Sequence, residues 1–136
     1  MNAAKRPRAA PTLLLLLYIA LILAVHLIPL SGNALDRNFV GPLRADHLLH
    51  CLLFFPWMVL VSPRLRSRPA GPRKITPGRH PVIGWLGLGI GLAAGAEALQ
   101  LFVASRSFNP LDALFNALGV LLGAGAMALA GKWFKV

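Results

Sequence analysis

Apolar residues occur in four long runs along this chain, separated by short polar segments. The runs cover residues 12–30, 44–61, 82–104 and 110–131. Each run approaches about 20 residues, the length that a helix needs to cross the hydrocarbon core of a bilayer. Apolar and polar positions show none of the alternation that a half-buried strand requires. The pattern therefore predicts an all-α integral membrane protein, a bundle of four transmembrane helices that forms one membrane domain over residues 1–136.

The composition supports a membrane protein and argues against a nucleic-acid binder. Hydrophobic residues make up 57% of the 136 residues, and the mean hydropathy is +0.66. A soluble chain of this length could not bury so much apolar surface in one core. The net charge of +10 is typical of nucleic-acid binders, but the basic residues lie in tails and loops, as membrane proteins use them. We therefore expect membrane lipids as partners, and no nucleic acid.

The lysine and arginine residues are distributed unevenly between the two sides of the predicted bundle. Most of them precede the first helix, lie in the loop 62–81 or follow the last helix: Lys5, Arg6, Arg8, Arg64, Arg66, Arg68, Arg73, Lys74, Arg79, Lys132 and Lys135. The other side has Arg37, Arg44 and Arg106. By the positive-inside rule, both termini and the loop 62–81 are predicted to be cytoplasmic. The single cysteine, Cys51, excludes an intramolecular disulfide and a cysteine metal cluster.

The acidic residues fall on the opposite, outer side. All four of them, Asp36, Asp46, Glu97 and Asp112, map to the outer loop or to the outer ends of helices. Charged side chains within membrane segments are costly and normally functional. Together with neighbouring polar residues they form a predicted ligand-binding cluster at one depth: Asp46, His50, Glu97, Gln100, Arg106, Asp112 and Asn116.

Some of these residues also fit ordinary structural roles. Asn109, Pro110 and Asp112 fit the N-cap, N1 and N3 positions of the last helix. Asp46 lies in a first helical turn, where a carboxylate interacts favourably with the helix dipole. Such roles do not explain why a histidine, a glutamate and two amides lie at the same level.

Two further histidines lie close to the predicted cluster. His26 is near the outer end of the first helix, where it could join the cluster, although a lone histidine at such a position is more often just hydrogen-bonded. His47 follows Asp46 directly and is expected to point away from His50.

Small residues mark the expected helix contacts. Gly87, Gly91 and Gly95 form a stripe on the third helix, and Gly119 and Gly123 continue the Asp112 stripe on the fourth. Such spacing allows helices to pack closely in a membrane. We therefore predict that both stripes make helix contacts. Pro56 should kink the second helix.

The second and fourth helices begin alike, with an aspartate followed four residues later by a polar side chain. The pairs are Asp46 with His50 and Asp112 with Asn116. This similarity suggests a pseudo-repeat of two hairpins with the same orientation in the membrane. A site between the hairpins would bring Asp46 and Asp112 together.

The segment from Glu97 to Gly123 has the pattern E-x2-Q-x-F-x3-R-x5-D-x3-N-x2-G-x3-G. This closely resembles the signature of the VanZ-like family of small bacterial membrane proteins, and Asp46-x3-His50 is similar to that family's D-x3-H near a helix start. The resemblance implies a multi-pass protein of the bacterial inner (cytoplasmic) membrane with a role in the cell envelope. The family takes its name from a member linked to glycopeptide (teicoplanin) resistance. His47 stands where the family often has lysine.

Three functions remain open at this stage. The first is recognition of an anionic lipid or a lipid-linked glycan precursor, in which the Arg106 guanidinium would grip a phosphate and the amides of Gln100 and Asn116 would bind oxygens. The second is a non-catalytic accessory subunit or chaperone of an envelope complex, with a membrane protein as partner. The third is an enzyme that acts on an envelope lipid.

The enzyme hypothesis has two forms. His50 could act as a general base held by Asp46. Alternatively, a divalent metal ion could be bound by carboxylate and imidazole groups, for which the candidate ligands are Asp46, His50, Glu97 and Asp112. An ion would also turn an acidic cluster into a site for phosphate.

Overall fold

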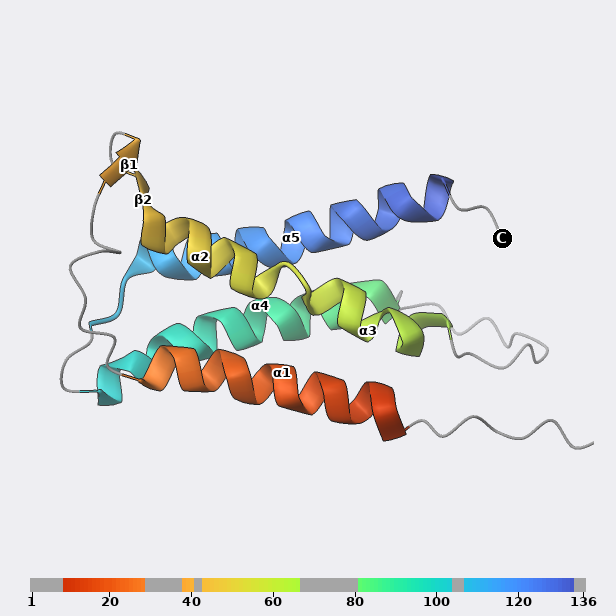
Figure 1. Ribbon diagram of the computed structural model, residues 1–136, viewed down its shortest axis with the longest axis horizontal. Coiled ribbons are helices and arrows are strands. Elements are labelled where there is room, and N and C mark those ends of the chain that lie inside the picture. The colour runs from red at the N-terminus through yellow and green to blue at the C-terminus, as the bar shows by residue number, and fades with distance from the viewer. Residues whose placement is uncertain (1–8, 29–37, 41–42, 67–80, 104–106, 134–136) are drawn as a thin grey trace, which may run out of the picture.

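The computed structural model describes residues 9–28, 38–40, 43–66, 81–103 and 107–133. Within these ranges the chain forms a bundle of helices (Figure 1). The elements are α1 (Ala9–Leu27), β1 (Asn38–Val40), β2 (Leu43–Arg44), α2 (Ala45–Phe54), α3 (Trp57–Arg66), α4 (Pro81–Leu99), the 3-10 helix η1 (Gln100–Phe102) and α5 (Pro110–Trp133).

Four helical segments are long and apolar enough to cross a membrane: Ala9–Leu27, Ala45–Leu65, Pro81–Phe102 and Pro110–Gly131. Most of their large apolar side chains are exposed on the outside of the bundle, as lipid-facing residues are. The predicted fold class, a four-helix transmembrane bundle, is confirmed. The chain is a multi-pass membrane protein.

Besides shifts of a few residues at several helix ends, the observed elements differ from the predicted ones in two respects. α3 continues to Arg66, so the start of the predicted loop at Ser62 is helical. The strands β1 and β2 pair antiparallel, with Asn38 opposite Arg44 and Val40 opposite Leu43. Strands of two and three residues are too short to show a period along the sequence, which is why the pattern did not predict them.

Pro56 interrupts the second membrane span rather than merely bending it. α2 ends at Phe54 and α3 begins at Trp57, because proline lacks the amide hydrogen that would continue the ladder. The Tyr18 hydroxyl of α1 donates a hydrogen bond of 2.5 Å to the carbonyl oxygen of Leu53, in the last turn of α2. Backbone polar groups need such internal partners at membrane depth.

The apolar core occupies the middle of the bundle and contains mostly side chains from α1, α3 and α4. Its buried members are Leu15, Ile22, Phe54, Trp57, Met58, Val61, Ala93, Ala96 and Val120. The Trp57 indole Nε1 donates to the carbonyl oxygen of Trp85 at 2.8 Å. A Cβ on Gly89 would lie 2.6 Å from a ring carbon of Trp57, so only glycine leaves room for this ring.

The two glycine stripes differ in what surrounds them. A Cβ on Gly119 or Gly123 would collide with the backbone carbonyl of Cys51 or Phe55, so α5 lies directly against the second span there. A Cβ on Gly87, Gly91 or Gly95 would meet nothing within 4 Å. The predicted packing of these three residues is therefore wrong within this chain. α4 packs instead through the face that carries Gly89, Ala93 and Ala96.

The first residue of α1 and the last residues of α5 lie at the same end of the bundle (Figure 1). The other end, which we call the cluster end, brings together the end of α1, the starts of α2 and α5, and η1. Away from the cluster end, the Arg64 guanidinium donates to the carbonyl oxygen of Pro11 at 3.2 Å and so connects α3 with the start of α1.

Candidate functional site

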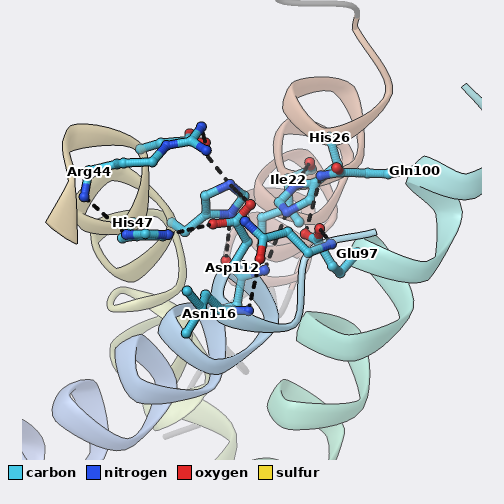
Figure 2. A network of polar contacts seen from close by, with 12 residues as sticks. Ile22, His26, Arg44, His47, Glu97, Gln100, Asp112 and Asn116 are labelled. Carbon is cyan, nitrogen blue, oxygen red and sulfur yellow. Dashed lines mark hydrogen bonds and ion pairs between the residues drawn. The ribbon is translucent and has the colours of Figure 1, made fainter. Parts of the chain in front are cut away.

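Polar side chains from all four membrane spans are buried at the cluster end (Figure 2). We call this set the buried cluster: His26, His47, His50, Glu97, Gln100, Asp112 and Asn116. Asp46 adjoins it with a side chain that is 15% exposed. The predicted site residues that the structure describes are therefore close together, and Arg106 lies outside the described residues.

Asn116 connects two histidines in a hydrogen-bond chain whose directions can be assigned. A carbonyl oxygen only accepts, so the His26 Nδ1–H group donates to the Ile22 oxygen at 2.8 Å. In a neutral imidazole the other nitrogen is an acceptor. His26 Nε2 therefore faces the Asn116 amide nitrogen at 3.4 Å. The Asn116 oxygen then accepts from the His50 Nδ1–H group at 2.9 Å.

This chain determines what His50 offers on its other side. Since Nδ1 of a neutral His50 ring carries the proton, Nε2 carries a lone pair. Nε2 lies 3.6 Å from Asp46 Oδ1 and 3.9 Å from Asp112 Oδ2. Both distances exceed those of ordinary hydrogen bonds. An imidazole nitrogen and two carboxylate oxygens thus converge without direct bonds between them.

His47 and Arg44 hold the two carboxylates from outside. The Arg44 backbone amide donates to His47 Nδ1 at 3.1 Å, so the His47 proton is on Nε2. That nitrogen lies 3.4 Å from Asp112 Oδ1. The Arg44 guanidinium donates to Asp46 Oδ2 at 3.3 Å. The His47 ring also stacks on Phe115, with ring centroids 4.9 Å apart.

Glu97 connects two helix ends in this arrangement through hydrogen bonds to both of its carboxylate oxygens. Its Oε1 accepts from the Asn109 backbone amide at 3.0 Å, and its Oε2 accepts from the Gln100 side chain at 3.2 Å. The Asn109 side chain accepts from the Leu111 amide at 3.1 Å, so Asn109 is the N-cap of α5, as predicted. Glu97 therefore fixes the end of α4 to the start of α5.

The sequence prediction for His47 needs correction, whereas His26 joins the cluster, which the sequence had left open as one of two interpretations. Both are almost fully buried and both contact cluster residues. His47 and His50 are three residues apart, which is 300° of helical rotation, so their directions differ by only about 60°. The spacing of three residues between His47 and His50 could therefore have predicted that His47 lies beside the cluster. His26 gave no such signal, because its partner lies 90 positions away in the sequence.

Two groups in the buried cluster have the ligand types and proximity to hold a metal ion. One consists of Asp46, His50 and Asp112, and the other of His26, His50 and Glu97. In each group one ligand atom per residue lies within 4.8 Å of the others. The predicted ligand candidates are thus divided between two overlapping sets that share His50.

Comparison with family models gives a match to VanZ/LLP1 over residues 14–131. The chain belongs to the VanZ/LLP1 family. Comparison with curated proteins finds no match, and neither does comparison with solved structures.

The fold of this VanZ-family protein brings residues from separate parts of the signature together. Asp46 and His50 on α2 meet Asp112 and Asn116 on α5. Asp46 and Asp112 are therefore close together, as a site between two hairpins required. The glycines of the signature, Gly119 and Gly123, let α5 approach the second span closely enough for this contact.

Proposed function

We propose that this VanZ-family protein recognises the anionic head group of an envelope lipid or lipid-linked glycan precursor at the outer face of the bacterial inner membrane. The observation that carries the proposal is the buried cluster, in which seven polar side chains are nearly inaccessible at one end of a small apolar bundle. Burial of so many polar groups costs stability unless they have a function.

The position of the cluster supports a lipid head group as ligand. It lies at a helix end, hence near the depth of the head groups, and the bulk of the bundle below it exposes apolar side chains. The positive-inside rule predicts cytoplasmic termini, and with that orientation the cluster would face outward. A lipid could then keep its chains beside the bundle while its head group reaches the cluster.

Positive charge at the cluster end is limited. Arg44 is one-third exposed and already lies against Asp46, and Arg106 is the residue proposed to bind the phosphate. Asp46, Glu97 and Asp112 would repel a phosphate unless a cation compensates them. The proposal therefore requires an additional positive charge when the head group is bound.

A second candidate function is that of an accessory subunit in an envelope complex. The observation that favours it is the face of α4 with Gly84, Gly87, Gly91 and Gly95, where nothing lies within 4 Å of an added Cβ. Such a face would allow close approach of a helix from another membrane protein.

Native mass spectrometry with lipid identification on gently extracted protein tests the proposal. We expect a phosphorylated lipid to remain with the wild type and to be lost from Arg106→Ala and Arg44→Ala, since each removes a guanidinium that is proposed to attract the phosphate. Arg73→Ala removes the same charge from the loop 62–81, which the sequence predicts to be cytoplasmic, and should retain the lipid. Bulk phospholipid alone, at equal amounts in all variants, would refute the proposal. A stoichiometric second protein without lipid would favour the accessory subunit.

A further inference from the structure

We propose that Asp46, His50 and Asp112 bind one divalent metal ion, with zinc as the best match. The ligand atoms are Asp46 Oδ1, His50 Nε2 and Asp112 Oδ2. They come from the first two turns of α2 and the first turn of α5, two helices that pack closely at Gly119. Imidazole nitrogen and carboxylate oxygen are ordinary zinc ligands.

The first argument is the direction of the His50 lone pair. The Asn116 oxygen accepts the Nδ1–H proton at 2.9 Å, and Asn116 itself is oriented by His26. This hydrogen-bond chain presents Nε2 as a lone-pair donor toward both carboxylates. Two carboxylates and a lone pair that face one another repel unless a proton or a metal ion lies between them.

The second argument is the spacing of these atoms. His50 Nε2 lies 3.6 Å from Asp46 Oδ1 and 3.9 Å from Asp112 Oδ2. A tetrahedral zinc ion with bonds of about 2.1 Å holds its ligands about 3.4 Å apart. Both distances from His50 are thus too long for hydrogen bonds, and a contraction of a few tenths of an ångström would bring each to metal geometry. One ligand atom from each of the three residues lies within 4.8 Å of the others.

The third argument is that a separate residue holds the remaining polar atom of each ligand. Arg44 holds Asp46 Oδ2, His47 faces Asp112 Oδ1, and Asn116 holds His50 Nδ1. Metal-binding histidines and carboxylates are usually oriented in this way. Asp112 Oδ1 and His47 Nε2 are both buried without a hydrogen bond, and a shift of Asp112 toward an ion would readjust this contact.

The alternative set of His26, His50 and Glu97 is less suitable. Both Glu97 oxygens already accept hydrogen bonds, from Asn109 and Gln100. His26 Nε2 faces the Asn116 amide. Binding an ion there would break contacts that connect α1, α4 and α5, whereas the set of Asp46, His50 and Asp112 keeps them.

The ion would provide the charge that the proposed function lacks. Three protein ligands leave a tetrahedral position open, and the partly exposed Asp46 provides the approach from outside. A phosphate oxygen of the head group could occupy that position. This role rests on the proposed function, but the binding of the ion itself does not and is tested without lipid.

The experiment is zinc titration by calorimetry, with metal analysis, on delipidated protein in detergent that carries no polyhistidine tag. We expect one Zn²⁺ per wild-type chain. Asp46→Asn and Asp112→Asn should each weaken binding by at least about tenfold, since each neutralises a ligand. The matched control Glu97→Gln changes a buried carboxylate of the same cluster and should retain the wild-type affinity.

Three outcomes would overturn the proposal: no stoichiometric zinc on the wild type, full affinity in Asp46→Asn, or loss of zinc in Glu97→Gln alone. If the aspartate variants fail to fold, Co²⁺ titration of the wild type decides. Visible absorption bands of tetrahedral cobalt with nitrogen and oxygen ligands would support the site, and a spectrum of hydrated cobalt would exclude it.

The failures of the two proposals can be told apart by lipid retention. Zinc binding without any retained phosphorylated lipid would refute the proposed function and leave the metal site. Lipid that stays bound after chelation with EDTA, on protein that takes up no zinc, would refute the metal site and leave the proposed function.

Discussion

Asn116 is the side chain on which the hydrogen-bond directions in the buried cluster depend. It is completely buried, and its two amide atoms face His26 and His50. The His26 tautomer follows from its bond to the Ile22 oxygen, and Asn116 passes this direction on to His50. An apolar side chain of similar size at this position would leave a buried donor on His50 and a buried acceptor on His26 facing no amide, and buried polar groups without partners are costly.

We therefore expect Asn116→Leu to lower the free energy of unfolding by about 1–3 kcal/mol. Unfolding by SDS in mixed micelles, with EDTA present to exclude metal effects, measures this change. Leu121→Ala is the control, because Leu121 lies on the same helix and is 50% exposed.

A double-mutant cycle with His50→Leu separates the hydrogen bond from general disruption. Once His50 is replaced by leucine, Asn116→Leu no longer leaves the His50 Nδ1–H group without an acceptor. The double variant should therefore lose about 1 kcal/mol less unfolding free energy than the two single variants lose together. Strictly additive losses would contradict the assigned contact between these two residues.

At the scale of elements, the crossing of α2 and α5 determines where the site lies. Gly119 lies against the Cys51 carbonyl, one turn below the contact between His50 and Asn116. A methyl group on Gly119 would meet backbone, which cannot rotate away as a side chain can. The two helices must therefore separate, and the ligands near the starts of both helices would separate with them.

Gly119→Ala should destabilise the protein by about 1–3 kcal/mol, the usual cost of overpacking. Gly91→Ala is the matched control. Nothing lies within 4 Å of its added Cβ, so stability should stay unchanged or rise by up to about 1 kcal/mol through helix propensity. The same unfolding assay measures both. Equal losses in the two variants would show that α4 packs through its Gly91 face and would contradict this arrangement.

The elements also show which features the sequence could predict. The four spans and the site residues of α2, α4 and α5 follow from apolar run length and from polar residues at helix ends. The environment of a glycine does not follow from spacing alone. Gly91 and Gly119 belong to similar stripes, yet one faces outward and the other contacts α2, because that difference depends on how neighbouring helices rotate about their axes.

For the whole molecule, the even number of spans places the start of α1 and the end of α5 at one end, and the buried cluster at the other (Figure 1). The distribution of lysine and arginine predicts that the first of these ends is cytoplasmic. The proposed function depends on this orientation, because a ligand in the outer leaflet meets the cluster only if the cluster end faces outward. Ser107, which is exposed beside the start of α5, marks that end.

Labelling of single cysteines with a membrane-impermeant maleimide in intact cells tests the orientation. On a Cys51→Ala background, which removes the only native thiol, Ser107→Cys should react from outside. Ser67→Cys, directly after α3, should react only after permeabilisation. If Ser67→Cys were labelled in intact cells and Ser107→Cys were protected, the protein would have the opposite orientation in the membrane. The buried cluster would then face the cytoplasmic leaflet, and the search for its lipid would have to move to that leaflet, although the same residues would still form the site.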